Sequence, residues 1–199
     1  MKQPLRQALL LALLGLSPLA EAHAPIKDIG AFYNGMLHPL LVPAHLIGLL
    51  VLGLLAGQQG LQSMRRSLAV FCLAVLLGLA SGIGMDEALA QSMLLLTAAV
   101  LGVLLALAVR LPSWVVWSAC ALLGLLLGLD SLPHATGWQR SLLGGLGTWL
   151  GACVVLLAVM VFAEAMTRSW QRIGLRILGA WIGSSALLVL SLMLVLPGA

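Results

Sequence analysis

Charged side chains are scarce in this chain: 8% of its 199 residues are charged, whereas 62% are hydrophobic. A soluble domain needs polar and charged side chains over much of its surface, so this composition excludes an ordinary soluble globular protein. Lipid must solvate most of the apolar surface instead. Because long apolar runs satisfy their backbone hydrogen bonds in hydrocarbon by forming helices, we expect an all-α integral membrane protein in contact with the lipid bilayer.

Cysteine is also rare, since Cys72, Cys120 and Cys153 are the only three in the chain. Each lies in a separate apolar run, and their spacing with other Cys or His residues is typical of neither a zinc site nor a disulfide framework. We therefore expect all three to be small core residues.

Motifs for catalysis and for nucleic-acid binding are missing as well. The chain has no G-x-S-x-G and no phosphate-binding loop, and the serines in its apolar runs have no histidine at a nearby register. We therefore predict that the protein is not an enzyme and holds no tight cofactor. The net charge of +4 does not indicate a nucleic-acid partner, because the arginines are scattered and form no basic stripe with interleaved aromatics.

The first 22 residues resemble a secretory signal peptide. Two basic residues precede the apolar run "ALLLALLGL", and the small-residue segment "AEAHA" follows. Cleavage after Ala22 would leave His23 as the mature amino terminus, and cleavage after Ala24 is the other site that fits. The alternative is that this segment stays as an uncleaved first helix.

Six later segments are apolar over about 20 residues, the length that crosses a hydrocarbon core. A short periplasmic segment, 23–34, precedes them, and 35–199 form a six-helix transmembrane bundle. The expected spans are 35–57, 67–85, 88–109, 113–130, 141–163 and 173–196. Glycine pairs at four-residue spacing predict close contact between these helices. They are Gly78 with Gly82, Gly124 with Gly128, Gly147 with Gly151, and Gly179 with Gly183.

Basic residues indicate the orientation of the bundle. Six of them fall on one side of the expected membrane: Arg65, Arg66, Arg110, Arg168, Arg172 and Arg176. Only Lys27 and Arg140 fall on the other side of the mature chain. By the positive-inside rule the first side is cytoplasmic. We therefore expect a protein of the bacterial inner membrane whose mature amino and carboxyl termini are both periplasmic.

The stretch "GMLHPLLVPAHLIGLL", residues 35–50, places two histidines at the periplasmic end of the first span. His38 and His45 are two helical turns apart, so a regular helix would separate them by about 10 Å. Ionisable groups inside a membrane favour a functional role, and imidazole suits nickel, cobalt or zinc as well as proton relays. The acids on the same side are Asp86, Glu87 and Asp130.

A structural role for the histidines is the alternative. Pro39 and Pro43 leave backbone carbonyls without their helical partners, and a neutral imidazole can hydrogen-bond such a carbonyl. In that case the rings turn back onto their own helix, with no carboxylate or second imidazole beside them. An ion site predicts instead that both rings face the bundle interior. It also predicts that the Gly124 and Gly128 face packs against the first helix and brings Asp130 near His38.

The stretch "GAFYNGMLHPLLVPAHLIGLLVLGLLAG", after a signal and before five further spans, resembles the HupE/UreJ family of hydrogenase and urease accessory membrane proteins. Those proteins are regarded as nickel or cobalt permeases. Their first span carries His-Pro and then Asp-His, in the pattern H-x(5)-D-H, followed by an apolar run and a G-L-x-A segment. His38, Pro39 and His45 match this pattern, and "GLLAG" follows at 53–57.

Two departures from the family pattern remove metal ligands. Ala44 occupies the place of the aspartate in the first span. The second signature, F-H-G-x-A-H-G-x-E, falls on "LLGLLLGLD" at 122–130, where Leu123 and Leu127 replace both histidines. The glycines and the acid remain, as Gly124, Gly128 and Asp130.

The residues left to hold a metal are therefore His38, His45 and Asp130, with His23, Asp86 and Glu87 as weaker candidates. The resemblance implies an inner-membrane permease or accessory protein for Ni²⁺ or Co²⁺ that serves metalloenzyme maturation. A protein of another class, a membrane scaffold that binds a periplasmic or membrane partner without transport, is the alternative. The identity of such a partner does not follow from the residues.

Processing of the signal gives a direct test. We expect the purified protein to begin at His23, or at Pro25 if cleavage follows Ala24, because the small residues of "AEAHA" suit a signal peptidase. Intact-mass spectrometry measures this. A mass that still includes the first 22 residues would mean an uncleaved helix and a seventh crossing.

Overall fold

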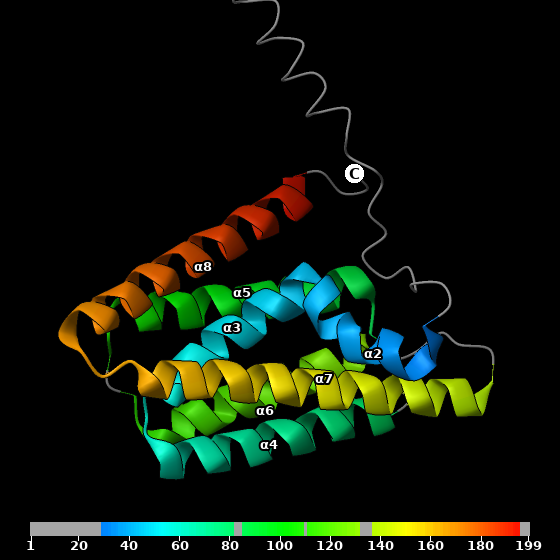
Figure 1. The fold of residues 1–199 in the computed structure, drawn as a ribbon. Coiled ribbons are helices and arrows are strands. Elements are labelled where there is room, and N and C mark those ends of the chain that lie inside the picture. Colours follow the sequence, from blue (N-terminus) through cyan, green and yellow to red (C-terminus); the bar gives the residue numbers. More distant parts are fainter. Residues whose placement is uncertain (1–28, 82–84, 110, 132–136, 196–199) are drawn as a thin grey trace, which may run out of the picture.

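A computed structural model of the protein describes residues 29–81, 85–109, 111–131 and 137–195. The described part is all-helical (Figure 1). Its helices are α2 (Gly30–Leu41), α3 (Pro43–Gly57), α4 (Leu61–Ala80), α5 (Glu87–Ala106), α6 (Ser113–Asp130), α7 (Trp138–Ala165) and α8 (Ser169–Val195). The expected signal peptide and His23 lie outside the described residues.

Five single helices, α4 to α8, are long and apolar enough to cross a membrane. The sixth expected span, 35–57, is broken: α2 and α3 meet at a bend of 69°, and the count reaches six only if this pair is one crossing. Helix α2 also begins at Gly30, inside the segment that was expected to precede the first span. The prediction of a helical membrane protein is confirmed, with an irregular first span.

Helix α3 occupies the centre of the bundle. It lies between α5 and α7 (Figure 1) and also contacts α2, α4, α6 and α8. Eleven of its 15 residues are buried. The sequence "LIGLLVLGLLAG" of α3 is apolar on all sides, so it can be enclosed by other helices without burying an unpaired polar group.

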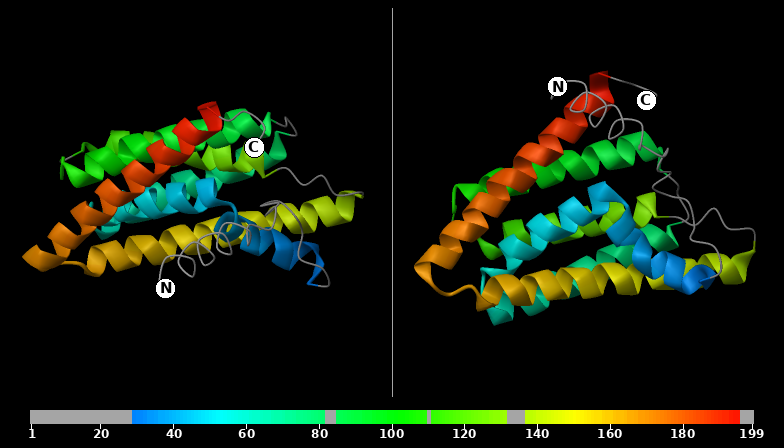
Figure 2. Two further views of the ribbon diagram at one scale, coloured as in Figure 1. Left: turned by 90° about the horizontal axis from the view of Figure 1, so that it is seen from above. Right: turned by 45° about the horizontal axis from the view of Figure 1, so that its top comes forward.

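Three helix pairs surround α3, and glycine allows each pair to pack closely. The pairs are α4 with α6, α2 with α7, and α5 with α8 (Figures 1 and 2). A methyl group built at Gly128 of α6 would meet the carbonyl oxygen of Val75 in α4, and one at Gly151 of α7 would meet that of Met36 in α2. Gly102 of α5 faces Gly183 of α8 in the same manner. The predicted role of glycine in helix contact is thus confirmed for these residues, whereas Gly82 lies outside the described residues.

The partner of the Gly124 and Gly128 face differs from the expected one. We predicted that this face packs against the first helix. It packs against α4 instead, where Gly124 faces Phe71 and Gly128 faces Val75. Hydropathy and glycine spacing locate a contact face on a helix but do not specify the helix that it meets.

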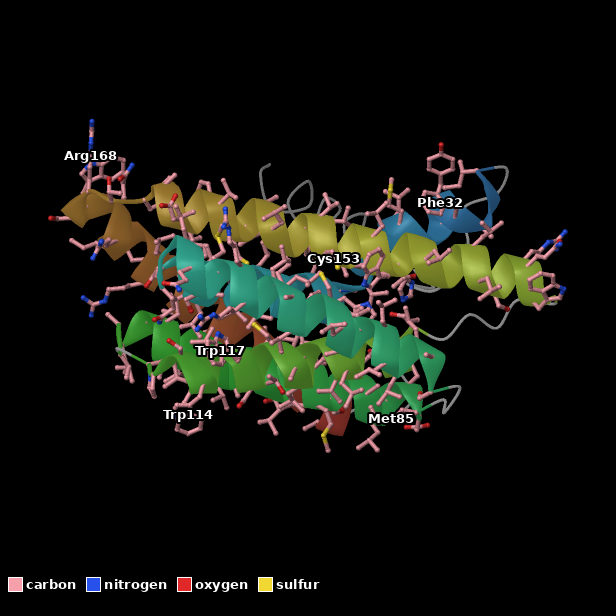
Figure 3. All side chains as sticks on the ribbon, turned by 90° about the horizontal axis from the view of Figure 1, so that it is seen from below. Phe32, Met85, Trp114, Trp117, Cys153 and Arg168 are labelled. Carbon is pink, nitrogen blue, oxygen red and sulfur yellow. The ribbon has the colours of Figure 1, made fainter. Side chains whose placement is uncertain are left out.

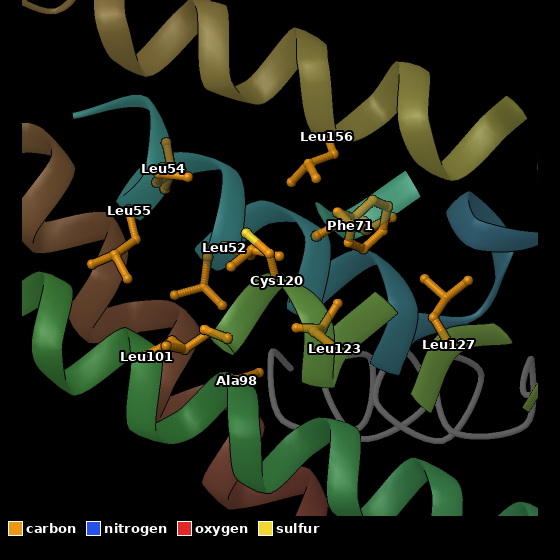
Figure 4. Close-up of a cluster of buried hydrophobic side chains, with 14 of the residues drawn as sticks. Leu52, Leu54, Leu55, Phe71, Ala98, Leu101, Cys120, Leu123, Leu127 and Leu156 are labelled. Atoms are coloured by element: carbon orange, nitrogen blue, oxygen red, sulfur yellow. The ribbon is translucent and has the colours of Figure 1, made fainter. Parts of the chain in front are cut away.

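The apolar core is formed where α3, α5, α6 and α7 converge (Figure 4). Leu52 of α3, Leu127 of α6 and Leu156 of α7 have no exposed surface. Leu123 of α6 is also fully buried and lies against Gly48 of α3. The leucines that replace the two family histidines on α6 therefore fill the core.

Most of the arginines in the described ranges lie at one end of the bundle, and Arg140, near the start of α7, lies at the other. Figure 3 places Arg168 and Trp114 at the first end, and Phe32 and Met85 at the other. The Arg66 guanidinium, near the start of α4, lies 5.7 Å from the centre of the Trp117 ring, near the start of α6. This distribution agrees with the side that the sequence assigns to the cytoplasm.

A single methyl group should disturb the α2–α7 contact. We expect Gly147→Ala to lower the stability of the purified protein by about 1–3 kcal/mol, because its new Cβ would overlap the carbonyl oxygen of Phe32. Thermal unfolding in detergent measures the effect. Gly174→Ala in α8 is the matched control, since its Cβ meets no atom within 4 Å. Equal stability of the two variants would contradict the close contact.

Candidate metal site

A proline breaks the first span, and the candidate site lies at this break. Val42 precedes Pro43, and its backbone is extended, at φ −85° and ψ 113°, because the proline ring disfavours the helical conformation of the preceding residue. Pro43 then occupies the first turn of α3, where its missing N–H costs least. The chain therefore ends one helix at Leu41 and starts another, tilted by 69°, two residues later.

This break brings the two histidines together. Their ring centroids are 5.1 Å apart, and the rings meet edge to face at 71°. On a regular helix the same residues would be separated by about 10 Å along the axis. The bend thus converts a sequence spacing of two turns into a contact between His38 and His45.

The third predicted residue, Asp130, forms an ion-pair contact with His45. The Nε2 atom of His45 lies 2.7 Å from Oδ2 of Asp130. The relative exposure of the two side chains is 0% and 1%, respectively. An ionised carboxylate can only accept, so Nε2 of His45 carries the proton and donates it to this hydrogen bond. Asp130 was expected beside His38, so the structure corrects its partner.

The antiparallel arrangement of α3 and α6 favours this pair. Asp130 is the last residue of α6, and its carboxylate lies beside the first turn of α3, where the helix macrodipole is positive. His45, in that first turn, lies beside the negative end of α6. The carboxylate of Asp130 therefore lies where the dipole of α3 stabilises a negative charge. The alternative in which the His45 ring turns back onto its own helix is wrong.

The other ring nitrogen of His45, Nδ1, is buried and has no hydrogen-bond partner among the described residues. If the imidazole is neutral, Nδ1 carries a lone pair, because the proton resides on Nε2. A ring nitrogen with a free lone pair, whose opposite nitrogen donates to a carboxylate, is the arrangement typical of metal-binding histidines.

Ser131 is a polar residue of this region that the sequence analysis did not select. It is 6% exposed, and its Oγ has no hydrogen-bond partner within the described ranges. Its position directly after Asp130 at the end of α6 was the only signal that could have identified it. A buried hydroxyl of this kind can accept a hydrogen bond from water bound to an ion.

The weaker candidates lie elsewhere or have other contacts. Asp86 caps α5, where its Oδ2 accepts from the backbone N–H of Leu89 at 3.1 Å, and Glu87 accepts from Gln91 at 3.1 Å. Both acids are exposed. Across the described ranges no group of three or more His, Cys, Asp or Glu side chains has the geometry to enclose a metal ion. The predicted residues thus form one buried pair with a second imidazole beside it.

A model of the HupE / UreJ protein family matches residues 11–189. This range contains both histidines and the carboxylate of the site, so the resemblance seen in the sequence is confirmed. No curated protein and no solved structure shows a significant match to the chain.

The buried pair predicts strong energetic coupling. His45→Leu or Asp130→Leu alone should destabilise the protein by about 3–5 kcal/mol, because each leaves a buried polar partner without its hydrogen bond. The double variant should cost no more than either single one, since neither partner is then left unpaired. Unfolding in mixed detergent micelles measures the cycle, with Ser131→Ala as a control for packing at this end. Additive effects of the two single substitutions would contradict the pair.

Proposed function

Because the chain belongs to the HupE/UreJ family, which is associated with nickel or cobalt transport and accessory roles in hydrogenase and urease maturation, we propose that it is an inner-membrane permease or accessory protein for Ni²⁺ or Co²⁺. The His45–Asp130 hydrogen bond of 2.7 Å carries this proposal, since it leaves Nδ1 of His45 as the ligand atom. The ion is the cargo, and the proposal includes no catalytic step.

Asp130 orients His45 rather than binding the ion itself. A carboxylate that accepts from one ring nitrogen fixes the tautomer and raises the basicity of the other nitrogen. In the family pattern an aspartate directly precedes the second histidine, and Ala44 stands there in this chain. A carboxylate from α6 is therefore available to the histidine that lacks its neighbouring aspartate.

His38 supplies the second imidazole of the proposed site. Two imidazoles that bind one ion through metal–nitrogen bonds of about 2.1 Å have ring centroids roughly 5 Å apart. The observed 5.1 Å agrees with that separation. Water completes the coordination. Borderline ions such as Ni²⁺ and Co²⁺ accept this mixture of nitrogen and oxygen ligands.

The proposed orientation of the bundle in the membrane puts the site at the outer face. We propose that both mature termini are periplasmic, which puts His38 and the start of α3 at the periplasmic end. Deeper along α6, Leu123 and Leu127 offer no lone pairs, so the ion meets its ligands near the entrance. A site with two imidazoles and water binds weakly and exchanges quickly, which suits capture of an ion that must be released.

Uptake of labelled Ni²⁺ or Co²⁺ by cells that depend on the protein tests the proposal. We expect His45→Leu to abolish uptake and Asp130→Asn to reduce it about 10- to 100-fold, because asparagine still accepts from Nε2 but contributes no charge. Asp86→Asn, the same chemical change on the exposed cap of α5, should leave uptake unchanged. Immunoblots of the membrane fraction give the amount of each variant, and uptake is expressed per amount of protein, because His45→Leu also lowers the stability.

Undiminished uptake in the His45→Leu cells at normal protein levels would contradict the metal site. No uptake above background in cells with the unmodified protein would contradict transport altogether. That second result would leave the scaffold function, in which the protein binds a periplasmic or membrane partner, as the remaining candidate.

A further inference from the structure

Two cysteines that are 81 residues apart in the sequence meet between α4 and α7. The Sγ atoms of Cys72 and Cys153 are 2.7 Å apart, and both side chains are partly buried. Cys153 lies in the middle of α7, on the side that faces α4 (Figure 3). Both cysteines pack against the apolar core, as expected, but their spacing in the sequence gave no sign of this contact.

A second contact fixes the position of the cysteine pair. The indole Nε1 of Trp149 donates to the backbone carbonyl of Cys72 at 3.0 Å. Trp149 precedes Cys153 by one helical turn on α7, so both residues face α4. The tryptophan thereby holds the two helices in the register that brings the sulfur atoms together.

The distance between the sulfur atoms favours a direct bond over a bridging ion. A metal bound to two thiolates at about 2.3 Å each would hold the sulfurs roughly 3.8 Å apart in a tetrahedral site. A disulfide bond is about 2.05 Å long, so the observed 2.7 Å requires a closure of less than about 1 Å.

We propose that Cys72 and Cys153 are a dithiol that a lipid-soluble quinone oxidises to a disulfide. The two thiols lose two protons and two electrons, one S–S bond forms, and the quinone becomes its quinol. Both cysteines lie near the middle of membrane-spanning helices, where water-soluble oxidants do not enter. This inference is independent of the proposed metal function.

The disulfide would cross-link α4 to α7. These two helices contact each other less extensively than each contacts its main partners. Helix α4 packs mainly with α6, which carries Asp130, whereas α7 packs mainly with α2 and α3, which carry the histidines. The His45–Asp130 pair connects these two groups of helices at one end. Oxidation would thus fix the relative position of the two groups of helices that form the metal site.

The number of free thiols tests the inference. The full-length protein, purified reduced in detergent, is treated with a fully substituted quinone that cannot add to thiols. It is then unfolded in N-ethylmaleimide and weighed by intact-mass spectrometry. We expect three maleimides on the reduced protein and one after quinone, on Cys120, because Cys120 is buried and remains free. Reduction before alkylation should restore three.

Variants identify the cysteines that react. Cys120→Ser should change from two maleimides to none on quinone treatment, whereas Cys72→Ser and Cys153→Ser should carry two before and after. Three maleimides on the quinone-treated protein would overturn the inference. Equally fast oxidation by glutathione disulfide would overturn the assignment of a membrane-soluble oxidant.

Discussion

In hydrocarbon, apolar side chains gain little by turning from lipid toward another helix, so helices associate where their backbones approach closely. The bundle meets this requirement with glycine. Three helix pairs form across glycine contacts, and α3 is enclosed between them. The position of α3 at the centre follows from those pairs, and with it the burial of His45. The candidate site therefore depends on contacts that carry no chemistry themselves.

A buried ionisable pair is costly in such an environment, and its cost indicates a role beyond packing. The pair of His45 and Asp130 is nearly inaccessible, and each partner comes from a different helix. Pro43 makes the pair possible, because the break before α3 lets that helix begin inside the bundle. The same break brings His38 beside His45, so one proline organises the whole site.

The departures from the family pattern have different structural consequences. Leu123 and Leu127 stand where the family pattern has histidines. Their side chains fill the apolar core and offer no lone pair to a metal ion at these two positions of α6. Ala44 removes a carboxylate that would lie next to His45 in the sequence. Asp130 provides a carboxylate to the same imidazole from α6. The two leucines thus offer no replacement for the histidines of the family pattern. At Ala44 the lost carboxylate has a counterpart, because Asp130 contacts His45.

The sequence by itself determined the class of the protein, the approximate extent of its membrane helices and the residues of the candidate site. Hydropathy, helix length and ionisable groups in apolar runs are local properties, so they can be recognised without a fold. The tertiary structure alone decided the partners: Asp130 contacts His45 rather than His38, and Cys72 contacts Cys153. Such contacts depend on which helices are neighbours and how each is rotated. Many arrangements of apolar helices satisfy the same hydropathy pattern, so only the packing of the helices distinguishes them.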